Sequence, residues 1–161
     1  MKKIIITLFL TLITFNVNAL EVKVEGNNMY LNGNIVTGDY YKVKDKLKHN
    51  MKIYLNSNGG LAYEGIAIGY LLNDHKVTTI IEENKECHSA CGFLFLAGEK
   101  RIFDGILGIH CTSIRGTNKC LDDEHEVNKS LKKFLLHVTN EKTTNFYFKH
   151  AQQIKIKAFK K

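Results

Sequence analysis

The sequence predicts an α/β protein in which a mainly parallel sheet is joined by crossover helices. Short runs rich in valine, isoleucine and threonine alternate along the chain with longer segments whose apolar residues recur at helical spacing. Parallel strands need such crossovers between them, so this alternation favours a parallel sheet. The length of 161 residues and the absence of a proline-rich or low-complexity linker predict one domain with a single core.

The first half of the chain is predicted to form a hairpin, a helix, a strand and a second helix. Apolar and polar residues alternate around a Gly-Asn-Asn turn in the hairpin. The first helix is expected to turn Tyr41, Val43 and Leu47 inward. In order, these elements are the hairpin 20–33, the helix 38–50, the strand 51–57 and, after a break at Asn58-Gly59-Gly60, the helix 61–75.

The second half continues the alternation and ends in a basic segment. Acidic residues open its longest predicted helix, where the positive end of the helix dipole stabilises them. The final lysines are interpreted as a solvated tail. The elements are the strand 76–83, the apolar helix 90–98, the short strands 101–104 and 106–110, the helices 122–140 and 143–153, and the tail 155–161.

Residues 1–19 have the pattern of a secretory signal peptide. Lys2 and Lys3 precede an apolar stretch of about a dozen residues, and Val17 and Ala19 stand at the spacing of a cleavage site. A membrane span needs about 20 apolar residues, so an uncleaved anchor is the weaker interpretation. We therefore expect cleavage after Ala19, a periplasmic or secreted protein of residues 20–161, and no stable membrane span after cleavage.

The formal net charge of +7 does not indicate a nucleic-acid-binding protein, because the basic residues are not interleaved with a binding motif. A loose contact of the basic tail with anionic membranes remains an alternative. The four cysteines favour disulfides in an exported chain, and local pairing of Cys87 with Cys91 and of Cys111 with Cys120 is the simplest of three connectivities. A zinc site is the competing interpretation, but the spacing matches no standard zinc motif, and we expect no metal.

Three polar or glycine-rich features follow predicted strands. In α/β sheets the reactive crevice lies beyond the carboxyl ends of the strands. Gly59 and Gly60 follow the strand 51–57, Ser89 follows the strand 76–83, and His110 ends the strand 106–110. Taken singly, these are an ordinary turn, a helix N-cap and a polar strand end. Taken together, they supply a nucleophile, a base and backbone N–H donors for an oxyanion.

On these residues the chain resembles the crotonase-like serine peptidase superfamily, in particular the Clp protease proteolytic subunit and predicted periplasmic Clp-like proteins. The resemblance covers about residues 50–112, through "IYLNSNGG", "CHSACGFLFLAGEKR" and "GIH". It implies stacked ββα units around a mainly parallel sheet. The Ser-Pro-Gly-Gly motif of that family appears here with Asn58 in the place of proline, and the nucleophile turn appears as His88-Ser89-Ala90.

The resemblance also implies roles for individual residues. Ser89 is the nucleophile and His110 the general base, while the N–H groups of Gly60 and Ala90 form the oxyanion hole. An extended peptide or protein substrate pairs with the segment Gly59, Gly60 and Leu61. No cofactor is implied, and a homo-oligomer is compatible with the rings that relatives form.

The chain departs from the Clp pattern in its acid. That family places an aspartate beyond the long helix, but no Asp or Glu follows Glu141 here. Asp122, Asp123 and Glu126 are the candidates nearest to His110, although acids at a helix start more often serve the helix itself. We therefore expect a Ser89–His110 dyad with weak activity or none. The alternatives are a catalytically inactive peptide-binding module and an acyl-CoA enzyme, which the predicted export and the cysteines disfavour.

Overall fold

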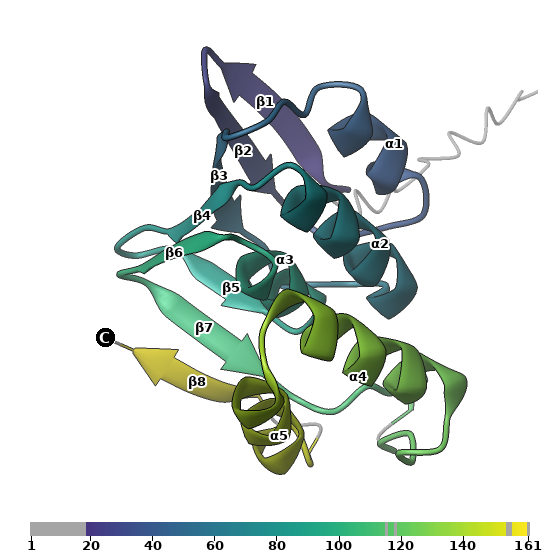
Figure 1. The fold of residues 1–161 in the computed structure, drawn as a ribbon. Coiled ribbons are helices and arrows are strands. Elements are labelled where there is room, and N and C mark those ends of the chain that lie inside the picture. The colour runs from purple at the N-terminus through teal and green to yellow at the C-terminus, as the bar shows by residue number, and fades with distance from the viewer. Residues whose placement is uncertain (1–18, 115, 118, 154–155, 161) are drawn as a thin grey trace, which may run out of the picture.

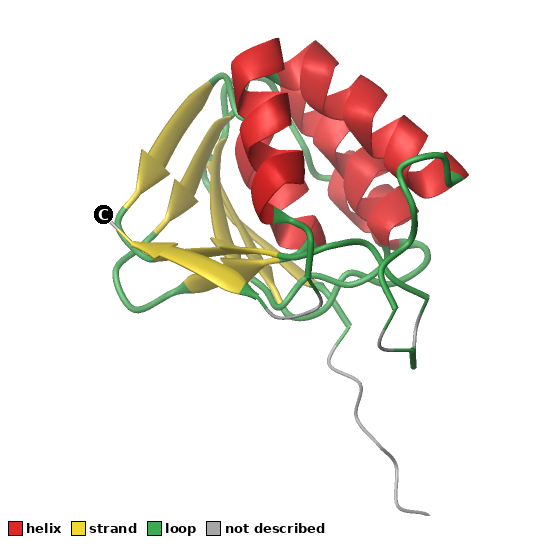
Figure 2. Cartoon of the chain, turned by 90° about the horizontal axis from the view of Figure 1, so that it is seen from below, coloured by secondary structure: helices red, strands yellow, loops and turns green. Residues whose placement is uncertain are grey.

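Two β-sheets that meet near Ser57 form one layer of the molecule, and helices cover one side of it (Figures 1 and 2). The computed structural model describes residues 19–114, 116–117, 119–153 and 156–160. The predicted signal peptide therefore lies outside the described residues except for Ala19. The predicted mixed α/β fold with a mostly parallel sheet is confirmed.

The larger sheet has the strand order β1-β2-β3-β4-β6. The predicted hairpin is confirmed by the antiparallel pair β1 and β2, and every later neighbour in this sheet is parallel. Its inward side chains, such as Met29, Ile53 and Ile81, are fully buried, as their alternation with polar residues requires. The strands are β1 (Glu21–Glu25), β2 (Asn28–Asn32), β3 (Lys52–Asn56), β4 (Thr78–Ile81) and β6 (Lys100–Phe103).

The smaller sheet contains the two strands that end directly before Ser89 and His110. It has the order β5-β7-β8, with β5 (Glu86–His88) parallel to β7 (Ile106–Ile109) and β8 (Lys157–Lys160) antiparallel to β7. A bridge between Ser57 and Cys87 joins it to the end of β3. We predicted a solvated basic tail for residues 155–161; part of that tail is strand β8, whose two lysines remain exposed.

Five helices lie in the described part of the chain, and α2 and α3 are the crossovers between parallel strands (Figure 1). The apolar helix α3 is buried over most of its length, as its sequence predicts. Tyr41 was predicted to face the core, but it is 66% exposed on α1, a helix of less than two turns. The other two residues predicted to turn inward, Val43 in α1 and Leu47 just after it, are buried. The helices are α1 (Asp39–Lys44), α2 (Ala62–Asp74), α3 (Ala90–Leu96), α4 (Glu126–Val138) and α5 (Glu141–His150).

Helix α4 begins four residues later than the sequence predicts. The acids Asp122 and Asp123 precede it, and His125 takes the N-cap position, where its ring accepts a hydrogen bond from the N–H of Val127. None of the described helices is long and apolar enough to cross a membrane.

Candidate functional site

Ser89 occupies a sharp turn between strand β5 and helix α3. Its backbone angles are φ 55° and ψ −125°, a region that a residue with a Cβ rarely adopts and that costs on the order of 1–3 kcal/mol. The N–H of Ser89 donates a 2.8 Å hydrogen bond to the carbonyl of Gly108 on β7, which holds the turn. The hydroxyl caps no helix N–H, although Ser89 stands at the N-cap position. The simple capping interpretation of this serine is therefore wrong, and its hydroxyl remains available for another role.

Both predicted disulfides are present, and each one flanks a predicted site residue. Cys87 is bonded to Cys91 across Ser89, and Cys111, next to His110, is bonded to Cys120. Cys87 belongs to strand β5 and Cys91 to helix α3, so this disulfide closes the serine turn itself.

The glycine pair lies directly against the serine turn. A Cβ built on Gly59, which has φ 89°, would stand 2.7 Å from the Ser89 Cβ and 2.9 Å from the Ala90 nitrogen. A Cβ on Gly60 would collide with the carbonyl of Ile35. Only glycine fits at these two positions, and the sequence-based expectation that the two segments converge is met.

The backbone hydrogen bonds on either side of Gly60 leave the N–H of Gly60 itself unpaired among the described residues. Ile35 donates its N–H to the Gly59 carbonyl and accepts the N–H of Leu61, so these two groups are occupied. In the described part of the chain, the N–H groups of Gly60 and Ala90 have no hydrogen-bond partner. Fewer backbone groups of Gly59, Gly60 and Leu61 are therefore free to pair with a substrate strand than the sequence predicts. Both N–H groups predicted to stabilise an oxyanion have no partner among the described residues.

A hollow of about 760 Å³ brings the predicted residues together. Gly60, Leu61, Ser89 and His110 all line it. Most of its remaining wall is apolar and includes Ile35, Val36, Ala62, Phe93, Val127 and Tyr147. A largely apolar cleft with a few convergent polar groups has the general character of a ligand-binding site.

His110 comes directly after strand β7, which ends one residue earlier than predicted, and its ring contacts the backbone of the next residue. Its Nδ1 lies 2.7 Å from the carbonyl oxygen of Cys111. The described residues show no hydrogen bond between His110 and Ser89. Such bonds are often long or misaligned in a free enzyme and form only when substrate binds.

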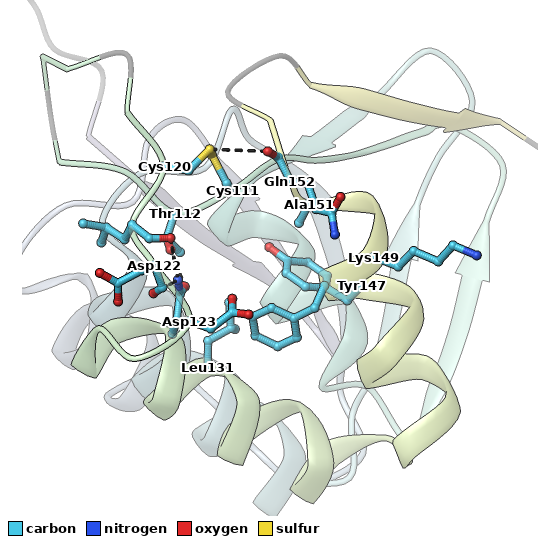
Figure 3. Close-up of a pocket in the computed structure, with 13 residues that line it drawn as sticks. Cys111, Thr112, Cys120, Asp122, Asp123, Leu131, Tyr147, Lys149, Ala151 and Gln152 are labelled. Carbon is cyan, nitrogen blue, oxygen red and sulfur yellow. Dashed lines mark hydrogen bonds between the residues drawn. A yellow bond between two sulfur atoms is a disulfide. The ribbon is translucent and has the colours of Figure 1, made fainter.

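None of the three candidate acids lines the hollow that contains His110. Asp122 and Asp123 line a second hollow of about 490 Å³, on the side opposite Lys149 (Figure 3). Glu126 points outward, with a side chain 78% exposed and 3.5 Å from the Lys129 ammonium. Neither hollow places one of these carboxylates with the imidazole.

Asn128 lines the second hollow and was not among the residues predicted from the sequence. It is 6% exposed on α4, and its amide bonds to the loop that follows His110. A signal was present in the sequence. Asn128 stands at the inward spacing of Leu131 and Leu135, and an amide in an apolar stripe indicates specific buried hydrogen bonds.

Tyr147 is the second residue that was missed, and it lines both hollows. Burial raises the pKa of its phenol, so the side chain stays neutral in the folded protein. In the unfolded chain the phenol ionises near pH 10. Folding stability should therefore fall as the pH rises above about 10, because only the unfolded state releases this proton there. Chemical denaturation at increasing alkaline pH would show the loss, and Tyr147→Phe should diminish it.

The described residues contain no cluster of three or more His, Cys, Asp or Glu that could hold a metal ion. Comparison with protein-family models and with curated protein sequences finds no match for this chain.

Proposed function

We propose that this protein is an exported serine hydrolase of the Clp and crotonase-like type, acting on peptides or proteins. The observation that carries the proposal is the strained turn at Ser89, which presents an uncommitted hydroxyl in the same hollow as His110 and Gly60. The N–H of Gly60 and that of Ala90, the residue after Ser89, are both unpaired in the described part of the chain. Strain of this kind persists where the surrounding structure enforces it and is concentrated at functional sites. The predicted leader and the two disulfides support export to an oxidising compartment.

In this mechanism Ser89 Oγ attacks the substrate carbonyl carbon and His110 Nε2 takes the hydroxyl proton. The N–H groups of Gly60 and Ala90 stabilise the oxyanion, and the positive end of α3 lies at the same place. His110 then returns the proton to the leaving amine as the C–N bond breaks. Water, activated by the same imidazole, hydrolyses the acyl-enzyme and restores the free serine.

A fluorophosphonate probe tests the proposal, because it phosphonylates only an activated serine. We expect one adduct on wild-type protein, located at Ser89 by peptide mass spectrometry. Ser89→Ala should lose the adduct completely, and His110→Ala should slow it by about 10²–10⁴-fold. Ser130→Ala is the matched control, since Ser130 lies on α4 and does not line the hollow.

An unlabelled but folded wild-type protein would overturn the enzyme proposal. The alternative would then be a peptide-binding module that uses the same hollow, a reading favoured by the lack of a Ser89–His110 hydrogen bond. Labelling that persists in Ser89→Ala would contradict the assignment of the nucleophile.

A further inference from the structure

We infer that the backbone carbonyl of Cys111 fixes the orientation and tautomer of His110, as the carboxylate does in a full catalytic triad. This inference rests on the proposed function, because it concerns the base of the same site. It assigns no new catalytic residue. It assigns a positioning role to the peptide group of Cys111 and to Asn128, which bonds to the neighbouring residue Thr112 and to the other arm of the same loop.

The hydrogen bond of His110 determines which ring nitrogen carries the proton. Nδ1 lies 2.7 Å from the Cys111 carbonyl oxygen, and a carbonyl can only accept. Nδ1 must therefore donate. The neutral ring then carries its lone pair on Nε2, the nitrogen that has to receive the proton of Ser89. In a full triad the carboxylate holds the histidine in this same tautomer.

The Cys111 carbonyl is held by bonds on both sides. The N–H of Cys111 donates to the carbonyl of Gln153 at 3.0 Å, and its side chain is bonded to Cys120. The next residue, Thr112, accepts the N–H of Leu121 at 2.8 Å. The two arms of this loop are thus tied together directly after His110, which restricts rotation of the Cys111 peptide (Figure 3).

Asn128 anchors the same loop to helix α4. Its Oδ1 accepts the hydroxyl of Thr112, and its Nδ2 donates to the carbonyls of Leu121 and Asp122 at 3.1 and 2.8 Å. The buried amide of Asn128 thus uses both of its N–H donors and its oxygen acceptor, and these bonds reach both arms of the loop, Thr112 on one and Leu121 and Asp122 on the other. Loss of the amide would leave these groups unpaired and would release the peptide that holds His110.

A backbone carbonyl provides only one of the two effects that a carboxylate has on a catalytic histidine. It selects the productive tautomer, but it is neutral and stabilises the imidazolium less, since it lacks the Coulombic attraction of a negatively charged carboxylate for the positive ring. The predicted weak activity follows from this difference. The acids Asp122, Asp123 and Glu126 then have no part in turnover.

The decisive measurement is the imidazole nitrogen NMR spectrum of uniformly ¹⁵N-labelled protein, recorded in alkaline buffer so that the two neutral tautomers can be distinguished. The His110 signals are assigned by their absence in His110→Ala. We expect the Nδ1–H tautomer in the wild type. In Asn128→Ala and in the double variant Cys111→Ser, Cys120→Ser, we expect a mixture of both tautomers. Asn73→Ala is the matched control: Asn73 donates to Ala97 far from this loop, and its loss should leave the His110 tautomer unchanged.

Labelling kinetics provide the second readout. Asn128→Ala should lower the fluorophosphonate labelling rate by roughly tenfold to hundredfold, as expected for a displaced catalytic group. Asp122→Asn, Asp123→Asn and Glu126→Gln should each label at rates within about twofold of the wild type. An Nε2–H tautomer in the wild type, or a folded acid variant that loses labelling, overturns the inference.

The two claims fail separately. The tautomer is read without any turnover, so an unlabelled protein with His110 in the Nδ1–H form would contradict the proposed function and leave the positioning role intact. A protein that is labelled at Ser89 but carries the Nε2–H tautomer of His110 would contradict the positioning role and support the proposed function.

Discussion

Replacing Gly59 with alanine is expected to abolish fluorophosphonate labelling at Ser89. The new Cβ would lie 2.5 Å from the His88 carbonyl oxygen, 2.7 Å from the Ser89 Cβ and 2.9 Å from the Ala90 nitrogen. All three are atoms of the serine turn that cannot rotate away, so the turn itself must shift. A displacement of about 1 Å at a catalytic group costs on the order of 10²-fold in rate, and this one also moves an oxyanion donor.

Gly38→Ala is the matched control for this change. Gly38 has φ 93°, close to the 89° of Gly59, but a Cβ there meets no atom within 4 Å. Both variants suffer the backbone cost of about 1–2 kcal/mol for a left-handed residue. Only Gly59→Ala should lose labelling, with both proteins checked for folding by circular dichroism. Equal labelling of the two variants would show that Gly59 does not shape the serine turn.

Phe134→Ala is expected to reduce the free energy of unfolding by about 3–5 kcal/mol. The ring is fully buried on α4 and packs edge-on against Tyr70, with ring centres 5.0 Å apart. It also fills the space above Gly69, where a Cβ on α2 would stand 2.5 Å from the ring. Alanine would leave a cavity between the two helices that the glycine surface cannot fill.

Leu136→Ala is the control on the same helix. Leu136 is 46% exposed, so its truncation should change stability by no more than about 0.5 kcal/mol. Urea denaturation of both variants gives the comparison. A similar small effect for both would mean that α4 is not packed on α2 as described.

The strands and helices themselves were largely predictable from the sequence, because their signals are local. Alternation in Glu21–Glu25 and Asn28–Asn32 defines a hairpin, and the buried run of α3 is visible in its composition. The predictions were wrong where the length of an element or its tertiary contacts overrode the local sequence pattern. Tyr41 fits a helical stripe but lies on a helix too short to bury it. The basic end of the chain gave no indication that it would pair with β7.

The sequence by itself determined the glycine pair and the candidate serine and histidine with their order along the chain, and it favoured the two disulfides that the structure contains. Only the tertiary structure decided what stands beside each of them. The strain at Ser89 arises from the join between β5 and α3, and the contact of His110 with the Cys111 carbonyl depends on a loop closed by Cys120 and Asn128. A carboxylate can be sought in a sequence because it is a side chain. A backbone carbonyl belongs to every residue, and it becomes a partner for an imidazole only when the folded chain directs it there.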